Sequence, residues 1–153
     1  MDVLTVGPSK RPRCLARNGA LLILAGLLCG LTIPAAPYPR LMLTAHIQFL
    51  VNGMVSIVAG LLLLSSVSRV GRWSERLILW GHVSTWAVCL SEVAGALWGA
   101  TRALPIAGAQ AGAPGASPWQ ETLIVACHAV PALALILAWA LLVWGFRKSP
   151  SGS

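Results

Sequence analysis

The sequence predicts an all-α protein: a four-helix transmembrane bundle with both termini in the cytoplasm. Hydrophobic residues make up 57% of the 153 positions and charged residues only 10%. The apolar residues lie in four long runs. Most of the cations lie before the first run, between the second and third runs, and after the fourth. A soluble domain of this length would need more charged residues to cover its surface.

Each apolar run is long enough to span a membrane, because a helix needs about 20 residues to cross the hydrocarbon core. A basic segment at 1–17 precedes a membrane domain at 18–147, and a cytoplasmic tail follows at 148–153. The connections must lie outside the hydrocarbon, where unpaired backbone groups are not tolerated. The predicted spans are about 18–36, 41–67, 77–100 and 118–146.

The start of the fourth span carries a recognisable helix signal. Ser117 can cap free backbone amides, Pro118 suits the first helical position, and Gln120 completes a capping box with Ser117. Glu121 follows in the first turn, where a negative charge favours the positive end of the helix dipole.

The distribution of cations predicts the orientation. Arg40 and Arg102 fall on one side of the predicted membrane, and the other nine Lys and Arg residues fall on the opposite side. The positive-inside rule places that majority side in the cytoplasm. We expect a multi-pass protein of the bacterial inner membrane. A net charge of +7 could indicate nucleic-acid binding. Such binding needs a soluble basic face with interleaved aromatic residues, and the sequence has none, so we expect no nucleic-acid partner.

Two local patterns allow more than one interpretation. Gly26-x-x-x-Gly30 and Gly95-x-x-x-Gly99 have the spacing of close helix packing, either within one chain or between chains. Trp98 falls near a predicted interface, where tryptophan commonly anchors a helix. Trp86 lies deeper, where it either packs or lines a pocket for an aromatic ligand.

Several polar side chains fall inside the spans, where an ionisable group costs on the order of 3 kcal/mol and needs a partner or a function. Any one of them alone is more often a hydrogen-bonding link between helices. A rise of about 1.5 Å per residue places four of them, on three helices, in the outer half of the bilayer. These four are His46, Asn52, Glu92 and His128; Gln48 lies beside them, and His82 lies near the cytoplasmic end.

The spacing of His46 and Asn52 limits what they can bind together. Six residues leave them about 120° apart around a helix, so they cannot both ligate one small ion. They could contact different parts of a large flat ligand. Glu92 is the strongest candidate for chemistry, because a carboxyl group in the membrane is harder to explain than an amide.

The segment Ala45-His46 followed by Asn52-Gly53-Met54 resembles a motif of the hydroxylaminobenzene mutase and styrene oxide isomerase proteins, which are small four-span membrane isomerases. The continuation is more similar to the mutases, in the strings Trp98-Gly99-Ala100, Leu104-Pro105-Ile106-Ala107 and Ser117 to Glu121, and then Leu142 to Arg147. The resemblance covers most of the chain, from about Arg40 to Arg147.

The resemblance implies an intramolecular rearrangement of a small aromatic hydroxylamine, such as hydroxylaminobenzene becoming 2-aminophenol. It also implies a b-type haem whose ferric iron acts as a Lewis acid, with His46 as its axial ligand and Asn52 directed toward substrate or cofactor. A homo-oligomer is expected, with a trimer favoured by the resemblance.

One departure concerns the third span, where the isomerases have a tyrosine near the substrate and a short alignment places Glu92. This favours an acid or hydrogen-bonding role toward a hydroxylamine, because burial favours the uncharged form of a carboxyl group. His128, Gln48, Trp86 and Trp98 are further candidates for the pocket. The alternatives are an epoxide isomerase and a non-enzymatic membrane subunit that binds haem or a small molecule.

Overall fold

The computed structural model describes residues 10–65 and 67–146, and no strand occurs among them. The tail predicted at 148–153 and the first nine residues of the basic segment lie outside the described residues. The helices are α1 (Arg11–Thr32), a 3-10 turn η1 (Ile33–Ala35), α2 (Pro39–Leu64), α3 (Arg72–Val83), α4 (Thr85–Trp98), α5 (Pro105–Ala111) and α6 (Pro118–Phe146).

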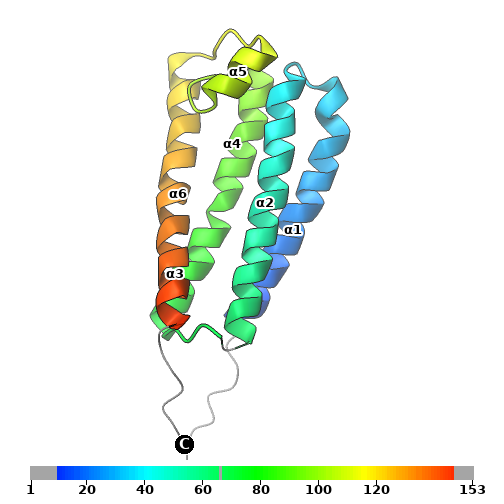
Figure 1. Ribbon diagram of the computed structural model, residues 1–153. Helices are drawn as coiled ribbons and strands as arrows, with labels where there is room; N and C mark the ends of the chain where they lie inside the picture. Colours follow the sequence, from blue (N-terminus) through cyan, green and yellow to red (C-terminus); the bar gives the residue numbers. More distant parts are fainter. Residues whose placement is uncertain (1–9, 66, 147–153) are drawn as a thin grey trace, which may run out of the picture.

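Four segments of this bundle are long and apolar enough to cross a membrane, which confirms the predicted fold class. Figure 1 shows that α1 starts and α6 ends at the same end of the bundle, while the short α5 lies across the other end. We refer to these as the basic end and the α5 end. The four segments are Arg11–Ala35, Pro39–Leu64, Arg72–Trp98 and Pro118–Phe146.

Helices α1 and α3 begin earlier than the apolar runs suggested, at Arg11 rather than residue 18 and at Arg72 rather than residue 77. Polar residues do not stop a helix that extends out of the hydrocarbon, and Pro12 suits the first turn of α1. The connection at 101–117 also contains a helix, α5, which begins at Pro105.

The third span is broken between Val83 and Thr85, where one continuous helix was expected. Side-chain hydroxyl groups compete for the carbonyl groups at this point. Ser84 Oγ donates to the carbonyl oxygen of Gly81 at 2.8 Å, and Thr85 Oγ1 donates to that of His82 at 2.7 Å. These bonds give two carbonyl oxygens just before the break side-chain donors from the residues that follow.

Helices α1 and α2 pack closely along a seam of glycines. A Cβ added at Gly26 would lie 2.9 Å from Phe49 Cβ, and one added at Gly30 would lie 2.8 Å from His46 Nδ1. The pair Gly26-x-x-x-Gly30 therefore serves packing within one chain.

The second glycine pair has a different role from the one its spacing suggested. Gly99 ends α4 with φ 71°, and a Cβ added there would lie 2.7 Å from Tyr38 Cε2. A Cβ added at Gly95 would have ordinary contact with Ile124, at 3.4 Å. Gly99 is therefore needed to end the helix beneath the Tyr38 ring, rather than to bring two helices together.

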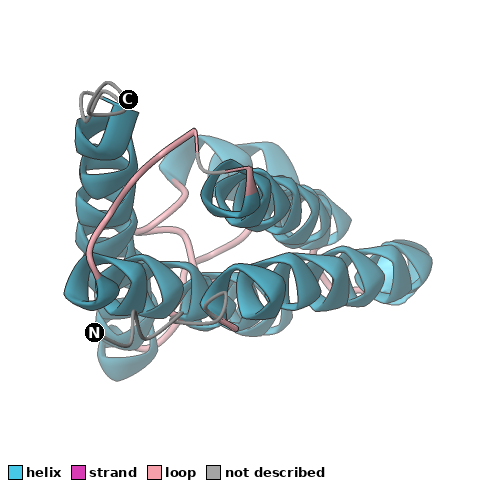
Figure 2. Cartoon of the chain, turned by 90° about the horizontal axis from the view of Figure 1, so that it is seen from below, coloured by secondary structure: helices cyan, strands magenta, loops and turns pink. Residues whose placement is uncertain are grey.

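The buried core consists of three clusters along the bundle. Leu15, Ile78 and Leu142 belong to the first, near the basic end. Leu22, Phe49 and Cys89 form the second, and a third lies below α5 and includes Met42 and Ala107. Figure 2 views the bundle from the basic end and shows the helices joined by short loops.

Candidate functional site

Glu92 and His128 face each other between α4 and α6. Glu92 Oε1 lies 3.2 Å from His128 Nε2, and the Glu92 side chain is only 4% exposed. The second carboxyl oxygen, Oε2, is buried and has no hydrogen-bond partner among the described residues. Sequence reasoning placed both residues at one depth, and the structure brings them into contact.

The environment of His128 fixes which of its nitrogens carries a proton. Nδ1 lies 2.8 Å from the carbonyl oxygen of Ile124, one turn back on α6, and 3.4 Å from Ser91 Oγ. A carbonyl oxygen can only accept, so Nδ1 carries a hydrogen and donates it. Nε2 of a neutral ring is then a lone-pair acceptor that faces Glu92.

A surface cleft of about 420 Å³ opens beside His128. The His128 side chain is 22% exposed, whereas Glu92 behind it is almost fully buried. The cleft is lined by Arg102 and His128 and by the apolar residues Ala103, Val125, Ala129 and Ala132. It is a mostly apolar hollow with one cation and one imidazole on its walls.

Asn52 lies in the interface between α2 and α4. Its side chain is buried, and Nδ2 donates to the carbonyl oxygen of Gln48 at 3.0 Å and lies 3.8 Å from Cys89 Sγ. Cys89 is three residues before Glu92 on the same helix. Asn52 and Glu92 therefore belong to neighbouring turns of the same interior.

His46 faces a different interface, between α2 and α1. Its Nδ1 lies 2.7 Å from the carbonyl oxygen of Gly26, so Nδ1 carries a hydrogen and donates it. Nε2 has no hydrogen-bond partner among the described residues. The divergence of His46 and Asn52 agrees with the angle of about 120° between them.

The four polar residues at this depth therefore do not converge on one cavity within a single chain. Glu92 and His128 form a pair, Asn52 lies beside that pair, and His46 lies on the other side of α2. Glu92 and His128 are in contact, but a shared depth alone does not determine which helix each side chain faces.

The remaining candidates have structural contacts. Trp86 Nε1 donates to Asn18 Oδ1 at 3.0 Å, and its ring packs edge-on against Phe49. The rings of Trp98 and Trp119 lie edge to face, 5.6 Å apart, at the α5 end. Gln48 is half-buried, and its backbone carbonyl accepts the Asn52 bond.

A second polar cluster in the basic half was not predicted as a group. His82 is fully buried, its Nδ1 lies 3.0 Å from Ser56 Oγ, and its Nε2 has no described partner. Asn18 reaches Ser56 Oγ and the His82 carbonyl oxygen, each at 3.5 Å, and accepts from Trp86. Asn18 was placed at the edge of the first span, so its contacts two turns into α1 were missed.

Glu121 connects the start of α6 to the loops on both sides of α5. Its carboxylate accepts backbone N–H groups from Thr101 and Arg102, each at 2.9 Å, and from Ala116 at 3.0 Å. Sequence reasoning assigned Glu121 to the helix dipole and did not find these three bonds. Half of the predicted capping box is present: the Ser117 N–H donates to Gln120 Oε1 at 2.9 Å, and the Ser117 hydroxyl donates to the same oxygen at 2.7 Å.

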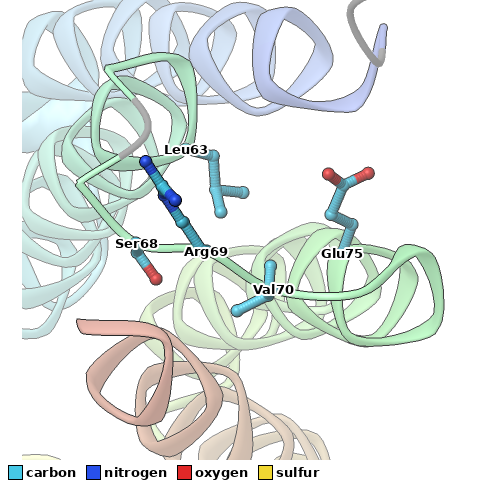
Figure 3. A pocket seen from close by; sticks show the side chains of 5 residues that line it. All are labelled: Leu63, Ser68, Arg69, Val70 and Glu75. Atoms are coloured by element: carbon cyan, nitrogen blue, oxygen red, sulfur yellow. The ribbon is translucent and has the colours of Figure 1, made fainter. Parts of the chain in front are cut away.

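Another cleft, of about 330 Å³, lies at the basic end and is shown in Figure 3. Ser68, Arg69 and Glu75 line it together with Leu63 and Val70. Ser68 Oγ donates to the Leu142 carbonyl oxygen at 2.8 Å, and Glu75 pairs with Arg11 at 3.0 Å. These contacts fasten the loop before α3, and none of the candidate site residues lies in this cleft.

Comparison with known proteins agrees with the resemblance found in the sequence. The family model described as styrene oxide isomerase matches residues 11–147. The hydroxylaminobenzene mutase HabB of Ectopseudomonas oleovorans is 31% identical over 142 residues, which cover 91% of this chain and 83% of the relative. HabA of the same organism is 34% identical over 133 residues, 78% of this chain and 92% of the relative. No solved structure matches the chain.

The chain belongs to the styrene oxide isomerase family. It is a multi-pass membrane protein of an isomerase and mutase family, and the two curated relatives described above are named as hydroxylaminobenzene mutases.

Proposed function

We propose that this protein converts an arylhydroxylamine, such as hydroxylaminobenzene, into the corresponding 2-aminophenol. The printed names of the two relatives support this substrate class over an epoxide. The observation that carries the proposal is the buried carboxyl group of Glu92 with its unpaired Oε2. Such a group can exchange a proton with a hydroxylamine.

The residues around His46 fit a haem iron bound through one axial ligand. The bond from Nδ1 to the Gly26 carbonyl oxygen fixes the ring and directs the lone pair to Nε2, as is usual for metal-binding histidines. The chain's other two histidines have different neighbours, Ser56 for His82 and Glu92 for His128. His46 would be the residue that holds the group.

The b-type haem expected from the resemblance would supply ferric Lewis-acid chemistry when it is bound. The chain's own residues would do the rest. Glu92 would give a proton to the nitrogen or oxygen of the hydroxylamine, and the ring carbon would later lose one proton to water, so that the reaction consumes no net proton. The apolar surroundings would exclude water from a reactive intermediate.

Asn52 would position the substrate beside Glu92. Its carboxamide lies between α2 and α4, the helix that carries Glu92, and its Nδ2 donates to the Gln48 carbonyl oxygen. Because His46 faces α1, a site that included both His46 and Glu92 would need residues from more than one chain. This supports the expected homo-oligomer, for which the resemblance favours a trimer.

Two measurements on purified protein test this proposal. The first is a Soret band that is lost in His46→Ala and retained in His128→Ala; a well-folded wild type without the band would overturn the haem assignment. The second is formation of 2-aminophenol from hydroxylaminobenzene, with styrene oxide as the competing substrate. Turnover of the epoxide alone would favour the alternative isomerase, and turnover of neither would favour a non-enzymatic binding protein.

A further inference from the structure

We propose that Glu92 and His128 form a proton-carrying pair, which rests as a carboxylic acid hydrogen-bonded to a neutral imidazole and exchanges its proton with the surface cleft through His128. In this proposal His128 is a positioning residue that acts through Glu92. Its effect on turnover rests on the proposed function, whereas the state of the pair can be measured without any substrate.

The hydrogen-bond geometry limits the number of protons in the pair. The Ile124 carbonyl oxygen keeps a hydrogen on Nδ1, so the contact of 3.2 Å between Nε2 and Oε1 holds a single proton. That proton lies either on the carboxyl group or on the imidazole. An ion pair in a site this buried costs several kcal/mol in lost hydration, which favours the uncharged arrangement.

The neighbouring side chains add nothing that would favour an ion pair. Ser91 contacts His128, and Cys89, one turn back from Glu92 on α4, contacts Asn52; these three neighbouring side chains are uncharged. Arg102 lies on the wall of the surface cleft that His128 also lines. Among the described residues, no Lys or Arg side chain forms an ion pair with the Glu92 carboxyl group.

The different exposure of Glu92 and His128 indicates the route by which the pair exchanges its proton with water. Glu92 is 4% exposed and His128 is 22% exposed, and His128 also lines the cleft. A proton given to the substrate from Glu92 leaves a carboxylate. Water in the cleft restores it by protonating His128, which passes the proton to Oε1. The hydroxide that remains in the cleft is neutralised by the proton that the aromatic ring of the substrate loses. The isomerisation therefore consumes no net proton.

The small number of acidic residues makes the resting state easy to observe. The chain has four Asp and Glu residues. Glu75 is paired with Arg11, and Glu121 accepts three backbone N–H groups, so both are carboxylates. Asp2 lies outside the described residues and is replaced by asparagine in every sample below.

Infrared spectroscopy of the substrate-free protein tests the resting state. We expect the C=O stretching band of a protonated carboxyl group in the parent protein, its loss in Glu92→Gln and its persistence in Glu121→Gln. In D2O the band should shift quickly in the parent protein and at least tenfold more slowly in His128→Leu. Absence of the band, or equal exchange in His128→Leu, would overturn the proposal.

Chemical rescue tests the route independently. His128→Gly leaves an imidazole-sized space beside the cleft, and added imidazole should restore the rapid exchange and a measurable part of kcat, with little effect on KM. Glu92→Gln with imidazole is the matched control and should show neither. If the wild type turns over the substrate, rescue of exchange without rescue of kcat would refute the role of the pair in turnover, and failure of imidazole to restore exchange in a folded variant would refute the pair itself. A wild type without turnover would refute the mutase function alone.

Discussion

The imidazole of His46 rests directly against Gly30, so that a methyl group at Gly30 would lie 2.8 Å from His46 Nδ1 and 2.9 Å from Cε1. The Gly26 carbonyl oxygen accepts from the same Nδ1 at 2.7 Å. The glycine pair of α1 therefore both packs against α2 and holds the ring of the proposed haem ligand.

Gly30→Ala should displace the His46 ring and weaken haem binding while the bundle stays folded. Changes that disturb the orientation of a metal-binding histidine typically cost about 10–100-fold in affinity. The measurement is the Soret band during titration with haemin, together with helical content by circular dichroism. Gly71→Ala is the matched control, because nothing lies within 4 Å of a Cβ there. Equal haem affinity in Gly30→Ala and wild type would contradict this role.

Gly99→Ala should destabilise the protein more than Gly112→Ala. Both glycines have positive φ, 71° and 63°, so both substitutions carry a backbone strain of about 1–2 kcal/mol. Only Gly99 also meets a neighbour, the Tyr38 ring, whereas nothing lies near Gly112. Thermal unfolding in detergent measures the difference. Tyr38→Ala should remove part of the cost of Gly99→Ala, and equal losses at both glycines would show that the Tyr38 contact is unimportant.

Glu121→Ala should loosen the α5 end. It leaves three backbone N–H groups without their carboxylate partner, at a cost of about 1–3 kcal/mol for a buried group without a partner. We expect a lower unfolding temperature and faster amide hydrogen exchange at Thr101, Arg102 and Ala116. Thr122→Ala is the control, because its exposed side chain only donates to the Pro118 carbonyl oxygen. Unchanged exchange at the three amides would refute the assigned role.

Asn18→Ala should lower the free energy of unfolding, because Asn18 joins the polar cluster in the basic half of the bundle. It removes the acceptor of Trp86 Nε1–H in a partly buried site, and the loss of such a hydrogen bond typically costs about 0.5–1.5 kcal/mol. In a Trp86→Phe background the same substitution should cost clearly less, because no indole N–H remains to be paired. Unfolding free energies of the four proteins in this double-mutant cycle provide the measurement, and strictly additive costs would argue against the bond.

The sequence predicted the number of spans well, because four apolar runs and the clustering of cations depend only on composition along the chain. It predicted a common depth for Glu92 and His128 for the same reason. It did not predict that His46 faces α1, since that depends on how α1 and α2 pack along their glycines. The break at Ser84 and the role of Glu121 were also missed, because both depend on hydrogen bonds to backbone groups of the folded chain.

The most direct test of the account is the fate of oxygen when the purified protein turns over hydroxylaminobenzene in water enriched in oxygen-18. An intramolecular transfer predicts 2-aminophenol whose hydroxyl oxygen carries no label, formed without any consumed cosubstrate, and a large loss of kcat in Glu92→Gln. Labelled product, or equal rates for wild type and Glu92→Gln, would contradict the central claim that this membrane bundle moves the substrate's own hydroxyl group with Glu92 as its acid.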